Sequence, residues 1–397
     1  MLPRIRGAAN LKRSGTRQLK PPSFTIGSPE CAGGILYMSE RGNRLLRFFD
    51  RAFGIPLVWI AGLAKPGGRQ VPTDVRRIGV LKTAAIGDAV IMSAIVQDLR
   101  EKFPLAEIVF FAGEGNASVG DLIPGLNRTI PLFIKNPFDA ALTIRSQGLF
   151  DVWFDFGQWP RLDALLSAAA NTRWRIGFDT TRQYRHFVYD DAVPHRKDIH
   201  ELENFRNLLR SLGIVGHHPP TLRRPAVNIK PNRVVVHMFP GGFRSYLKEW
   251  PLASWRLLVN ALISQGYEIV LTGGTSDKKR AEGFLTTVER PANVSMAVGQ
   301  TLNETAKILS SASLVVTVNT GIMHMAVALG CRILALHGPT SALRWGPLGN
   351  RATAIKSALP CSPCLHLGFD YGCPVNDCMK AISIDEVLAK VNEALQG

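Results

Sequence analysis

The chain alternates between short apolar runs and longer segments whose apolar residues recur every three or four positions. Short apolar runs favour buried strands, and the longer period favours helices packed against them. Regular alternation of the two predicts a parallel sheet covered by helices on both faces. The expected strands are residues 77–82, 107–112, 152–156, 233–238, 268–272, 314–318 and 332–336, and the expected helices are residues 87–103, 162–170, 251–265, 278–288, 301–311 and 384–395.

One stretch interrupts the alternation. Residues 217–232 are rich in proline and basic residues and have no apolar period, which is typical of a linker. The segments on either side, residues 76–216 and 233–397, each restart the strand-and-helix pattern. We therefore predict an α/β protein with two Rossmann-like domains facing across a cleft, with ligands bound at the carboxyl ends of the strands.

The most informative turn lies at residues 319–324, between an apolar run and an apolar helical pattern. It brings backbone N–H groups, the Thr320 hydroxyl and the His324 imidazole to the start of a helix. Such a helix start favours anions, because its N–H groups lack partners and the helix dipole is positive there. Taken alone the signal is common among α/β proteins, and a diphosphate is the guest that it suggests.

Three other glycine-rich turns follow predicted strands of the same half, near residues 239–251, 273–275 and 338–340. Glycine lets the backbone approach a ligand, and arginine or lysine can meet phosphate. Because all four turns are expected at carboxyl ends of strands, they predict one nucleotide-diphosphate pocket. The candidate residues of this nucleotide-diphosphate pocket are Gly241, Arg244, Lys248, Gly274, Thr275, Asn319, Thr320, Gly321 and His324.

In the first half, the turn at residues 83–88 has neither the dinucleotide-binding glycine pattern nor the P-loop pattern. A nicotinamide-dependent enzyme or a P-loop NTPase is therefore disfavoured. The turn instead carries one carboxylate, Asp88, at the start of a predicted helix. An aspartate there is either a helix N-cap or a general base at the mouth of the cleft.

The composition shows that the N-terminal part of the chain is basic. The 397 residues carry a formal charge of +16, and residues 1–75 hold 12 Lys and Arg against 4 Asp and Glu, a difference of +8. This excess suggests a lipid surface, a nucleic acid or a phosphorylated substrate. We see no aromatic-and-basic platform, so nucleic acid is not an expected partner.

The extension at residues 1–75 has two parts. Residues 1–37 are polar and rich in proline, glycine and serine, and are expected to be disordered. Residues 53–64 are apolar and flanked by basic residues, which fits either an interfacial anchor on an anionic membrane or a helix packed on the domain behind it. No run of about 18 apolar residues exists, so an ordinary transmembrane helix is not expected.

Four cysteines lie close together near the end of the chain, within residues 361–378. Four such thiols can hold a tetrahedral zinc ion or an iron–sulfur cluster. Reduced thiols around a loop, or disulfides, are the alternatives. The candidate ligands are Cys361, Cys364, Cys373 and Cys378.

Several of these motifs together resemble glycosyltransferase family 9, the heptosyltransferase family of lipopolysaccharide core assembly. The matching segments are residues 86–88, 248–251, 271–274, 320–326 and 336–340, and the resemblance extends from about residue 76 to the end. It implies the GT-B fold, with the acceptor bound by the first half and the sugar nucleotide by the second. It also implies inversion at the anomeric carbon, and no metal for catalysis, so that any zinc at the cysteines would be structural.

Carried over to this sequence, the resemblance makes Asp88 the catalytic base. Lys248 would hold the diphosphate, and Thr320, Gly321 and His324 would line the same phosphates, where fixed donors stabilise the leaving group. One position departs from the pattern. The family usually has aspartate where this chain has Asn319, which keeps hydrogen bonding but loses the charge, and so could alter ligand orientation, donor preference or rate.

The leading hypothesis is an inverting glycosyltransferase that moves a heptose from ADP-heptose to a lipopolysaccharide core or another surface glycan. Its partners would be the nucleotide sugar, a lipid-linked or surface-glycan acceptor, and an anionic membrane touched peripherally. The expected location is the cytoplasm, at the inner face of the bacterial cytoplasmic membrane. The alternatives are a transferase with a different donor or acceptor, and a non-catalytic protein that binds nucleotides or glycans.

Overall fold

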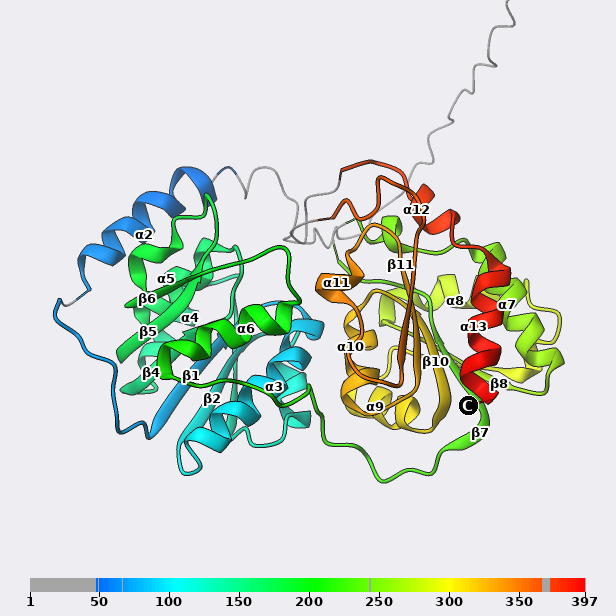
Figure 1. Cartoon of the computed structure of the whole chain (residues 1–397), viewed down its shortest axis with the longest axis horizontal. Helices are drawn as coiled ribbons and strands as arrows, with labels where there is room; N and C mark the ends of the chain where they lie inside the picture. Colours follow the sequence, from blue (N-terminus) through cyan, green and yellow to red (C-terminus); the bar gives the residue numbers. More distant parts are fainter. Residues whose placement is uncertain (1–47, 49, 66, 243, 366–371, 397) are drawn as a thin grey trace, which may run out of the picture. The chain divides into compact units, whose positions relative to one another are not determined.

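The computed structural model describes residues 48, 50–65, 67–242, 244–365 and 372–396. The expected disorder of residues 1–37 lies outside the described residues. The helices and strands within them group around two separate parallel sheets (Figure 1). All predicted strands and helices are present, with ends that differ by a few residues.

The first sheet has six parallel strands in the order β3-β2-β1-β4-β5-β6, which is the Rossmann order. Its central strands are buried along nearly their whole length, as expected when helices cover both faces. The strands are β1 (Arg77–Lys82), β2 (Glu107–Gly113), β3 (Arg128–Leu132), β4 (Phe150–Asp155), β5 (Thr172–Asp179) and β6 (Asp191–Pro194), and the helices are α3 (Ile86–Lys102), α4 (Pro137–Arg145), α5 (Arg161–Ala169) and α6 (Glu201–Leu209).

The second sheet repeats this topology. Its order is β12-β11-β10-β7-β8-β9, so that β7 takes the place of β1 and β10 that of β4. The strands are β7 (Lys230–His237), β8 (Glu268–Gly273), β9 (Val294–Val298), β10 (Ala312–Val318), β11 (Ile333–His337) and β12 (Ala352–Lys356), and the helices are α7 (Leu252–Ser264), α8 (Lys278–Leu285), α9 (Leu302–Ser310), α10 (Gly321–Ala328), α11 (Ala342–Trp345), α12 (Asp377–Lys380) and α13 (Ile384–Gln396).

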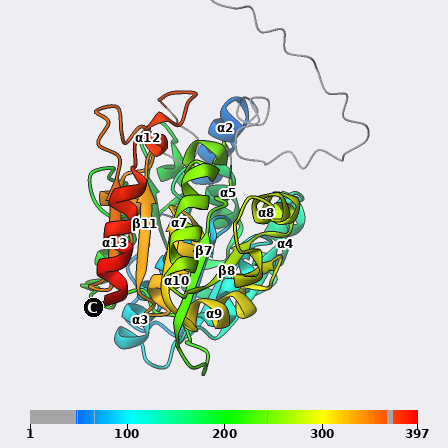
Figure 2. The same ribbon diagram turned by 90° about the vertical axis from the view of Figure 1, so that its right-hand side faces the viewer.

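Two helices of the second half pack side by side against its sheet. The carboxyl-terminal helix α13 packs beside α7, as Figure 2 shows, and both contribute to one apolar cluster with β7, β8 and β10. Within that cluster Trp250 and Trp255 meet edge to face, with ring centroids 5.1 Å apart. Trp250 is buried in this cluster and therefore serves packing.

The two sheets locate the ligand-binding edge. Strand order reverses between β1 and β4 in the first sheet, and between β7 and β10 in the second. Ligands of open α/β sheets bind outside the carboxyl ends of strands at such a reversal. The Asp88 turn follows β1, and the turns at residues 238–248 and 319–321 follow β7 and β10. The candidate residues therefore leave the sheets at the expected edges.

The connection between the two sheets differs slightly in length from the predicted linker. Strand β7 already begins at Lys230, so the connecting stretch without helix or strand ends at residue 229 rather than 232. Its start is fixed by Asp98 of α3, whose carboxylate accepts hydrogen bonds from the backbone N–H groups of His217 and His218, each at 3.0 Å. The domain limits 76–216 and 233–397 stay predictions.

Some elements escaped the sequence analysis. Strands β3, β5, β6 and β12 and helices α4 and α6 were not expected, because their apolar residues are interrupted by charges or prolines. The apolar segment before the first sheet forms helix α2 (Gly54–Leu63), which packs against α5 and the short 3₁₀ helix η2 (Arg185–Val188). Within the described part of the chain, no helix is both long and apolar enough to cross a membrane.

Candidate active site

Helices α3 and α10 cross at two glycines, and this crossing brings the two halves of the candidate site together. A Cβ added to Gly87 would lie 2.8 Å from Cδ2 of His324, and one added to Gly321 would lie 2.9 Å from Cβ of Ile86. Both distances are too short for any larger residue without a shift of the backbone. The glycines thus allow the turn after β1 to touch the turn after β10, and Asp88 lies one residue beyond the contact.

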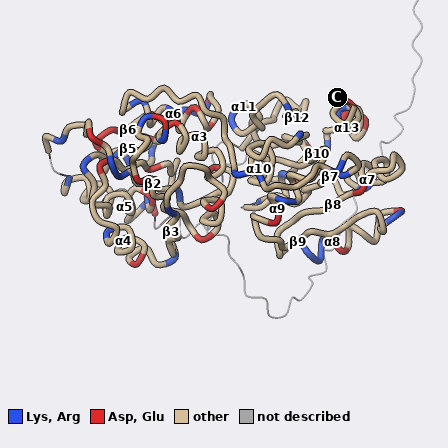
Figure 3. Tube along the Cα trace, turned by 90° about the horizontal axis from the view of Figure 1, so that it is seen from below, with Lys and Arg blue, Asp and Glu red and all other residues tan. Residues whose placement is uncertain are grey.

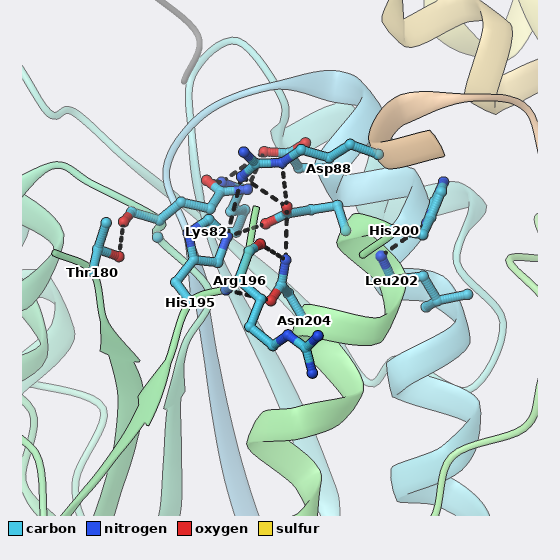
Figure 4. A network of polar contacts seen from close by, with 12 residues as sticks. Lys82, Asp88, Thr180, His195, Arg196, His200, Leu202 and Asn204 are labelled. Carbon is cyan, nitrogen blue, oxygen red and sulfur yellow. Dashed lines mark hydrogen bonds and ion pairs between the residues drawn. The ribbon is translucent and has the colours of Figure 1, made fainter. Parts of the chain in front are cut away.

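Asp88 is the third residue of α3 and is buried. The residue in the N-cap position is Ala85, at φ 74°, so the interpretation of Asp88 as an N-cap is wrong. Its Oδ2 atom instead lies 2.8 Å from Nζ of Lys82 and accepts a hydrogen bond from Nε2 of Gln158 at 2.9 Å (Figure 4). Lys82 also donates to Oε1 of Gln158, which closes a buried triangle of three side chains.

The triangle gives Asp88 a fixed orientation. Lys82 ends β1, Asp88 opens α3, and Gln158 lies in the loop after β4, so each side chain is anchored on a different element. A buried carboxylate is stable as an ion only if it is paired and hydrogen-bonded. The ammonium group of Lys82 is the charged partner of the Asp88 carboxylate, and Gln158 adds the hydrogen bond. The arrangement can accept a proton from a hydroxyl that reaches this edge.

The network continues from Gln158 to Glu201 at the start of α6. Burial alone would raise the pKa of Glu201, but His195, Arg344 and a hydrogen bond with Gln158 lower it to about 2. Oε1 of Glu201 lies 2.8 Å from Nε2 of His195, and Oε2 lies 3.2 Å from Nη2 of Arg344. Arg344 belongs to α11, so an ion pair links an element of the second half to the triangle around Asp88.

A second buried cluster supports the loop that carries Gln158. Asp155, at the end of β4, accepts hydrogen bonds from Arg185 at 2.8 Å, from the Tyr189 hydroxyl at 2.6 Å and from Ser167 at 2.9 Å. Arg185 also donates to the carbonyl of residue 157. Acidic and basic residues are interspersed around β5, β6 and α6 (Figure 3), which is where this cluster and the Glu201 cluster lie. Both clusters hold the residues after β4 in place.

Asp163 adds a titratable group beside this cluster. Burial, reinforced by the charge of Asp155, raises the pKa of Asp163 to about 6, although Arg185, Lys82 and a hydrogen bond from Thr83 act in the opposite direction. The Thr83 hydroxyl donates to Oδ1 of Asp163 at 2.6 Å. Asp163 thereby ties α5 to the turn between β1 and α3.

On the donor side, Thr320 is the N-cap of α10. Its hydroxyl oxygen accepts a hydrogen bond from the backbone N–H of Met323 at 3.3 Å, and the N–H groups of the first helical turn begin at Gly321. His324 is 8 % exposed, and burial lowers its pKa to about 3, with His200 and His337 acting in the same direction. His324 is therefore neutral near pH 7 and can donate one hydrogen bond to an anion.

Asn319 makes a contact that an aspartate at this position could not make. Its Nδ2 donates to the carbonyl of Trp345 at 3.1 Å, which fixes the turn after β10 to the end of α11. The next residue of that end, Gly346, offers its carbonyl to Nε2 of His200 at 3.1 Å. An aspartate at position 319 has no N–H to donate to Trp345, so the departure from the family pattern has a local partner.

The remaining donor-side candidates lie in two loops at the same sheet edge. Lys248, at the end of the 3₁₀ helix η4 (Ser245–Lys248), donates to the carbonyl of Gly241 at 3.0 Å. Arg244 has a left-handed backbone with φ 50° just before η4. Gly274 donates its N–H to Asp277 at 2.8 Å, and Thr275 opens the 3₁₀ helix η5 (Thr275–Asp277), with both residues exposed. These loops follow β7, which pairs with β10, and β8, which pairs with β7 on its other side.

The cysteine cluster is compact enough for its thiols to influence one another. Burial, with Cys364, Cys373 and Cys361 acting in the same direction, raises the pKa of the Cys378 thiol to about 11. Burial, together with the hydrogen-bonded Cys373, also raises the pKa of Cys364. The described cysteines are free thiols, so disulfides at these positions are not formed. Among the described residues, no three of these thiols have sulfur atoms within 4.8 Å of one another, so the four do not form a ready-made metal site.

Several site residues were not found from the sequence. They are Lys82, Gln158, His195, Glu201 and Arg344, which come from five separate elements. Only Lys82 left a local signal, because a lysine ending an otherwise apolar strand must have a buried partner or reach the surface. The others depend on contacts between residues far apart in the sequence, such as Arg344 and Glu201, which are 143 positions apart.

The family model for glycosyltransferase family 9 (heptosyltransferase) matches residues 162–373, more than half of the chain. The chain belongs to this family. A curated relative, lipopolysaccharide heptosyltransferase 1 of Pseudomonas aeruginosa, is 27 % identical over 317 residues, which cover 73 % of this chain and 86 % of the relative. The expected family membership is thus confirmed.

Solved structures agree on the fold. The Escherichia coli ADP-heptose lipopolysaccharide heptosyltransferase II superposes with a TM-score of 0.66 at 21 % identity, covering 81 % of this chain and 98 % of that chain. The iron-containing dodecameric glycosyltransferase TibC of enterotoxigenic E. coli has a TM-score of 0.53 at 16 % identity, covering 82 % and 79 %. The fold of this family-9 chain is GT-B, as predicted.

Proposed function

We propose that this family-9 glycosyltransferase moves a heptose from ADP-heptose to a hydroxyl of a lipopolysaccharide core or another surface glycan, with inversion at the anomeric carbon. The observation that carries the proposal is the α3–α10 crossing. It joins an oriented carboxylate, Asp88, to an anion-binding helix start at Gly321 and His324. The kinship to the P. aeruginosa heptosyltransferase supports the sugar, and the ADP-heptose enzyme of E. coli with the same fold supports the nucleotide.

The chemistry follows from the charges at that crossing. The acceptor oxygen attacks the anomeric carbon from the face opposite the diphosphate, while the bond from that carbon to the diphosphate oxygen breaks. The acceptor hydroxyl gives its proton to Asp88. The contacts to Lys82 and Gln158 are both at Oδ2, so we assign proton acceptance to Oδ1. Because Lys82 and Gln158 hold the carboxylate of Asp88 in a fixed orientation, the base is positioned before the acceptor arrives.

Negative charge builds on the departing ADP. The N–H groups at the start of α10, the neutral His324 and the cation of Lys248 are the donors that we assign to it. Fixed donors aimed at developing charge are usually the largest catalytic contribution. We propose that these groups suffice and that transfer needs no metal ion. Turnover that survives dialysis against EDTA would support this, and turnover restored only by a divalent cation would contradict it.

The decisive experiment compares Asp88→Asn with a matched control. Transfer from ADP-heptose to a heptose-deficient lipopolysaccharide acceptor is measured together with ADP binding by calorimetry. We expect Asp88→Asn to lower kcat by about 10³ or more while the Kd for ADP changes less than threefold, because only proton transfer is lost. The control Asp121→Asn removes an exposed carboxylate and should leave both values unchanged. If the Asp88→Asn variant turns over as fast as the wild type, Asp88 is not the base.

The nearest alternative keeps the reaction and changes the donor. Asn319 is the observation that favours it, because it replaces the family's usual charge close to the diphosphate site. Thermal-shift measurements with ADP-, UDP- and GDP-sugars rank the donors, since a ligand stabilises the folded state by mass action. A non-catalytic binding protein would show a clear shift with one nucleotide sugar and no turnover with any acceptor.

We also propose a structural metal ion at Cys361, Cys364, Cys373 and Cys378, which would have to draw the four sulfur atoms closer together than they lie in the structure. Zinc is our first candidate because four thiolates suit it. Iron is the second, and TibC is an iron-containing protein with the same fold. Elemental analysis of protein purified without chelator should give about one zinc or iron per chain. The double variant Cys364→Ser/Cys378→Ser should reduce the metal content to background. Less than a tenth of an equivalent in the wild type would end this proposal.

The proposed acceptor is lipid-linked, so the enzyme must meet it at a membrane. We propose a peripheral location at the inner face of the bacterial cytoplasmic membrane, where nucleotide sugars are available. Helix α2 is the part of the chain that suggests how this contact is made.

A further inference from the structure

Helix α2 is an addition to the Rossmann topology. It precedes β1, the first strand of the first sheet (Figure 1). The E. coli heptosyltransferase II structure is covered to 98 %, whereas 81 % of this chain is covered, so part of this chain has no counterpart there. Its inner face covers a small apolar cluster through Val58, so it is the outer face of α2 that needs another explanation.

One face of α2 is firmly seated on the first half. Gly54 and Val58 are buried, and a Cβ added to Gly62 would lie 2.7 Å from the carbonyl oxygen of Phe187. Two polar contacts fasten the ends. Arg161 of α5 forms an ion pair with Asp50, and Nζ of Lys65 donates to the carbonyl of Tyr189. The helix therefore has a fixed inner face and a defined outer face.

The outer face is apolar where a helix on a soluble protein is normally polar. Phe53, Leu57, Ile60 and Leu63 follow one another at helical spacing and are 58 %, 50 %, 56 % and 66 % exposed. Trp59 lies beside them and is 50 % exposed. The helix itself, Gly54–Leu63, contains no charged residue. Contiguous exposed apolar side chains of this kind mark a surface that another molecule covers.

Length and charge favour a lipid bilayer as that molecule. A ten-residue helix is about 15 Å long, half of the roughly 30 Å hydrocarbon core, so it can lie in the interface but cannot span it. Residues 51–73 include Arg51, Lys65 and Arg69 and no acidic residue, although Lys65 donates to the Tyr189 carbonyl and Arg69 pairs with Asp190. Tryptophan on the apolar face and basic residues at the ends are typical of helices bound to anionic membranes.

We propose that α2 docks the enzyme on an anionic bilayer, with Phe53, Leu57, Trp59, Ile60 and Leu63 inserted among the lipids. This inference rests on the proposed function only for its purpose, which is to present a lipid-linked acceptor to the base.

The link from the bilayer to the base runs through one arginine. Arg161 pairs with Asp50, just before α2, and opens α5 three residues after Gln158. Gln158 in turn holds Asp88. The start of α2 and the base are thus anchored to the same short segment after β4. A bilayer that covers α2 is therefore connected to the base through this segment.

The test measures binding of the full-length chain to sedimented vesicles. Vesicles contain phosphatidylcholine alone or with about a third phosphatidylglycerol. We expect wild type to bind the anionic vesicles at least tenfold better than neutral ones, since each basic residue near the surface contributes roughly fivefold. The double variant Leu57→Gln/Ile60→Gln should lose at least tenfold in binding. The control Leu105→Gln/Val215→Gln alters two side chains that are 96 % and 81 % exposed elsewhere, and should bind like wild type.

Activity distinguishes this proposal from the proposed function. With an acceptor freed of its acyl chains, the Leu57→Gln/Ile60→Gln variant should turn over like wild type, and with a vesicle-embedded acceptor it should be several-fold slower. If the wild type shows no turnover in either assay, the proposed function is contradicted. The vesicle-binding measurement does not depend on turnover and still tests the docking of α2. Equal binding of wild type and variant to anionic vesicles overturns the proposal. A wild-type dimer that dissociates in the variant, seen by ultracentrifugation, overturns it in favour of a second copy.

Discussion

Arg344 of α11 and Glu201 of α6 form a buried ion pair between elements that belong to different sheets. Nη2 of Arg344 lies 3.2 Å from Oε2 of Glu201, and the two side chains are 3 % and 0 % exposed. Glu201 also contacts His195 and shares a hydrogen bond with Gln158, which holds Asp88. One carboxylate thus connects the triangle of Lys82, Asp88 and Gln158 in the first half to the helix that follows β11.

Removing one partner of this pair should be costly. Arg344→Met leaves the Glu201 charge buried beside a single histidine, and breaking a buried pair costs about 3–5 kcal/mol. We expect urea unfolding to show a loss of that size. The double variant Arg344→Met/Glu201→Gln should recover at least 1 kcal/mol of it, because no charge remains buried. Single and double variants whose losses add within about 0.5 kcal/mol would show that the two side chains are not coupled.

Lys82 should matter for the reaction as well as for stability. Lys82→Met removes the cation from the carboxylate of Asp88, which stays buried with Gln158 as its neutral partner. We expect kcat to fall by about 10²-fold with the Kd for ADP unchanged, since the donor side is untouched. Kinetics and calorimetry on the same preparation measure both. The control Lys135→Met, in the turn before α4, should keep wild-type kcat, and a Lys82→Met enzyme with wild-type kcat would exclude Lys82 from the mechanism.

The sequence was a good guide to the elements that carry one dominant signal. The apolar runs of β1 and β10 and the turn at Thr320 were all located from the local pattern alone. The edge strands β3 and β6 were missed because a strand with one exposed side needs fewer apolar residues.

The candidate site shows the same division. Asp88 and His324 were found because each follows a buried strand at a turn. Glu201 and Arg344 were not, because neither belongs to a local pattern and each is buried only through the other. The assignment of Asp88 as an N-cap failed because α3 begins one turn earlier, after Ala85, than a capping aspartate would require.

Acid should destabilise the protein through buried histidines. Burial lowers the pKa values of His237, His324 and His337 from the ordinary 6.5 to about 4, 3 and 4. Between pH 6.5 and 4 the unfolded chain binds protons at these residues and the folded chain does not, so the free energy of unfolding falls as the pH falls. Each histidine contributes at most about 1.4 kcal/mol per pH unit.

One carboxyl group opposes this trend. The pKa of Asp163 is raised from 3.8 to about 6, so the folded chain takes up that proton first and gains stability as the pH falls from 6 to 4. Three histidines outweigh it, and Tm should therefore fall steadily from pH 7 to pH 5. The variant His337→Asn should show a shallower fall over the same range. A wild-type Tm that stays level or rises between pH 7 and pH 5 would contradict the buried, neutral state of these histidines.

Asn319→Asp tests the position at which this chain departs from the family pattern. The substitution removes the N–H that donates to the carbonyl of Trp345 and places a carboxylate near that carbonyl and the proposed diphosphate site. We expect a loss of about 1–3 kcal/mol in the free energy of unfolding, because a buried acceptor loses its donor. We also expect weaker binding of ADP, because like charges repel. Asn319→Ala is the matched control, since it loses the same hydrogen bond without adding charge. If the aspartate variant binds ADP more tightly than both wild type and Asn319→Ala, then residue 319 does not face the diphosphate as proposed, and its amide serves only to fix the end of α11.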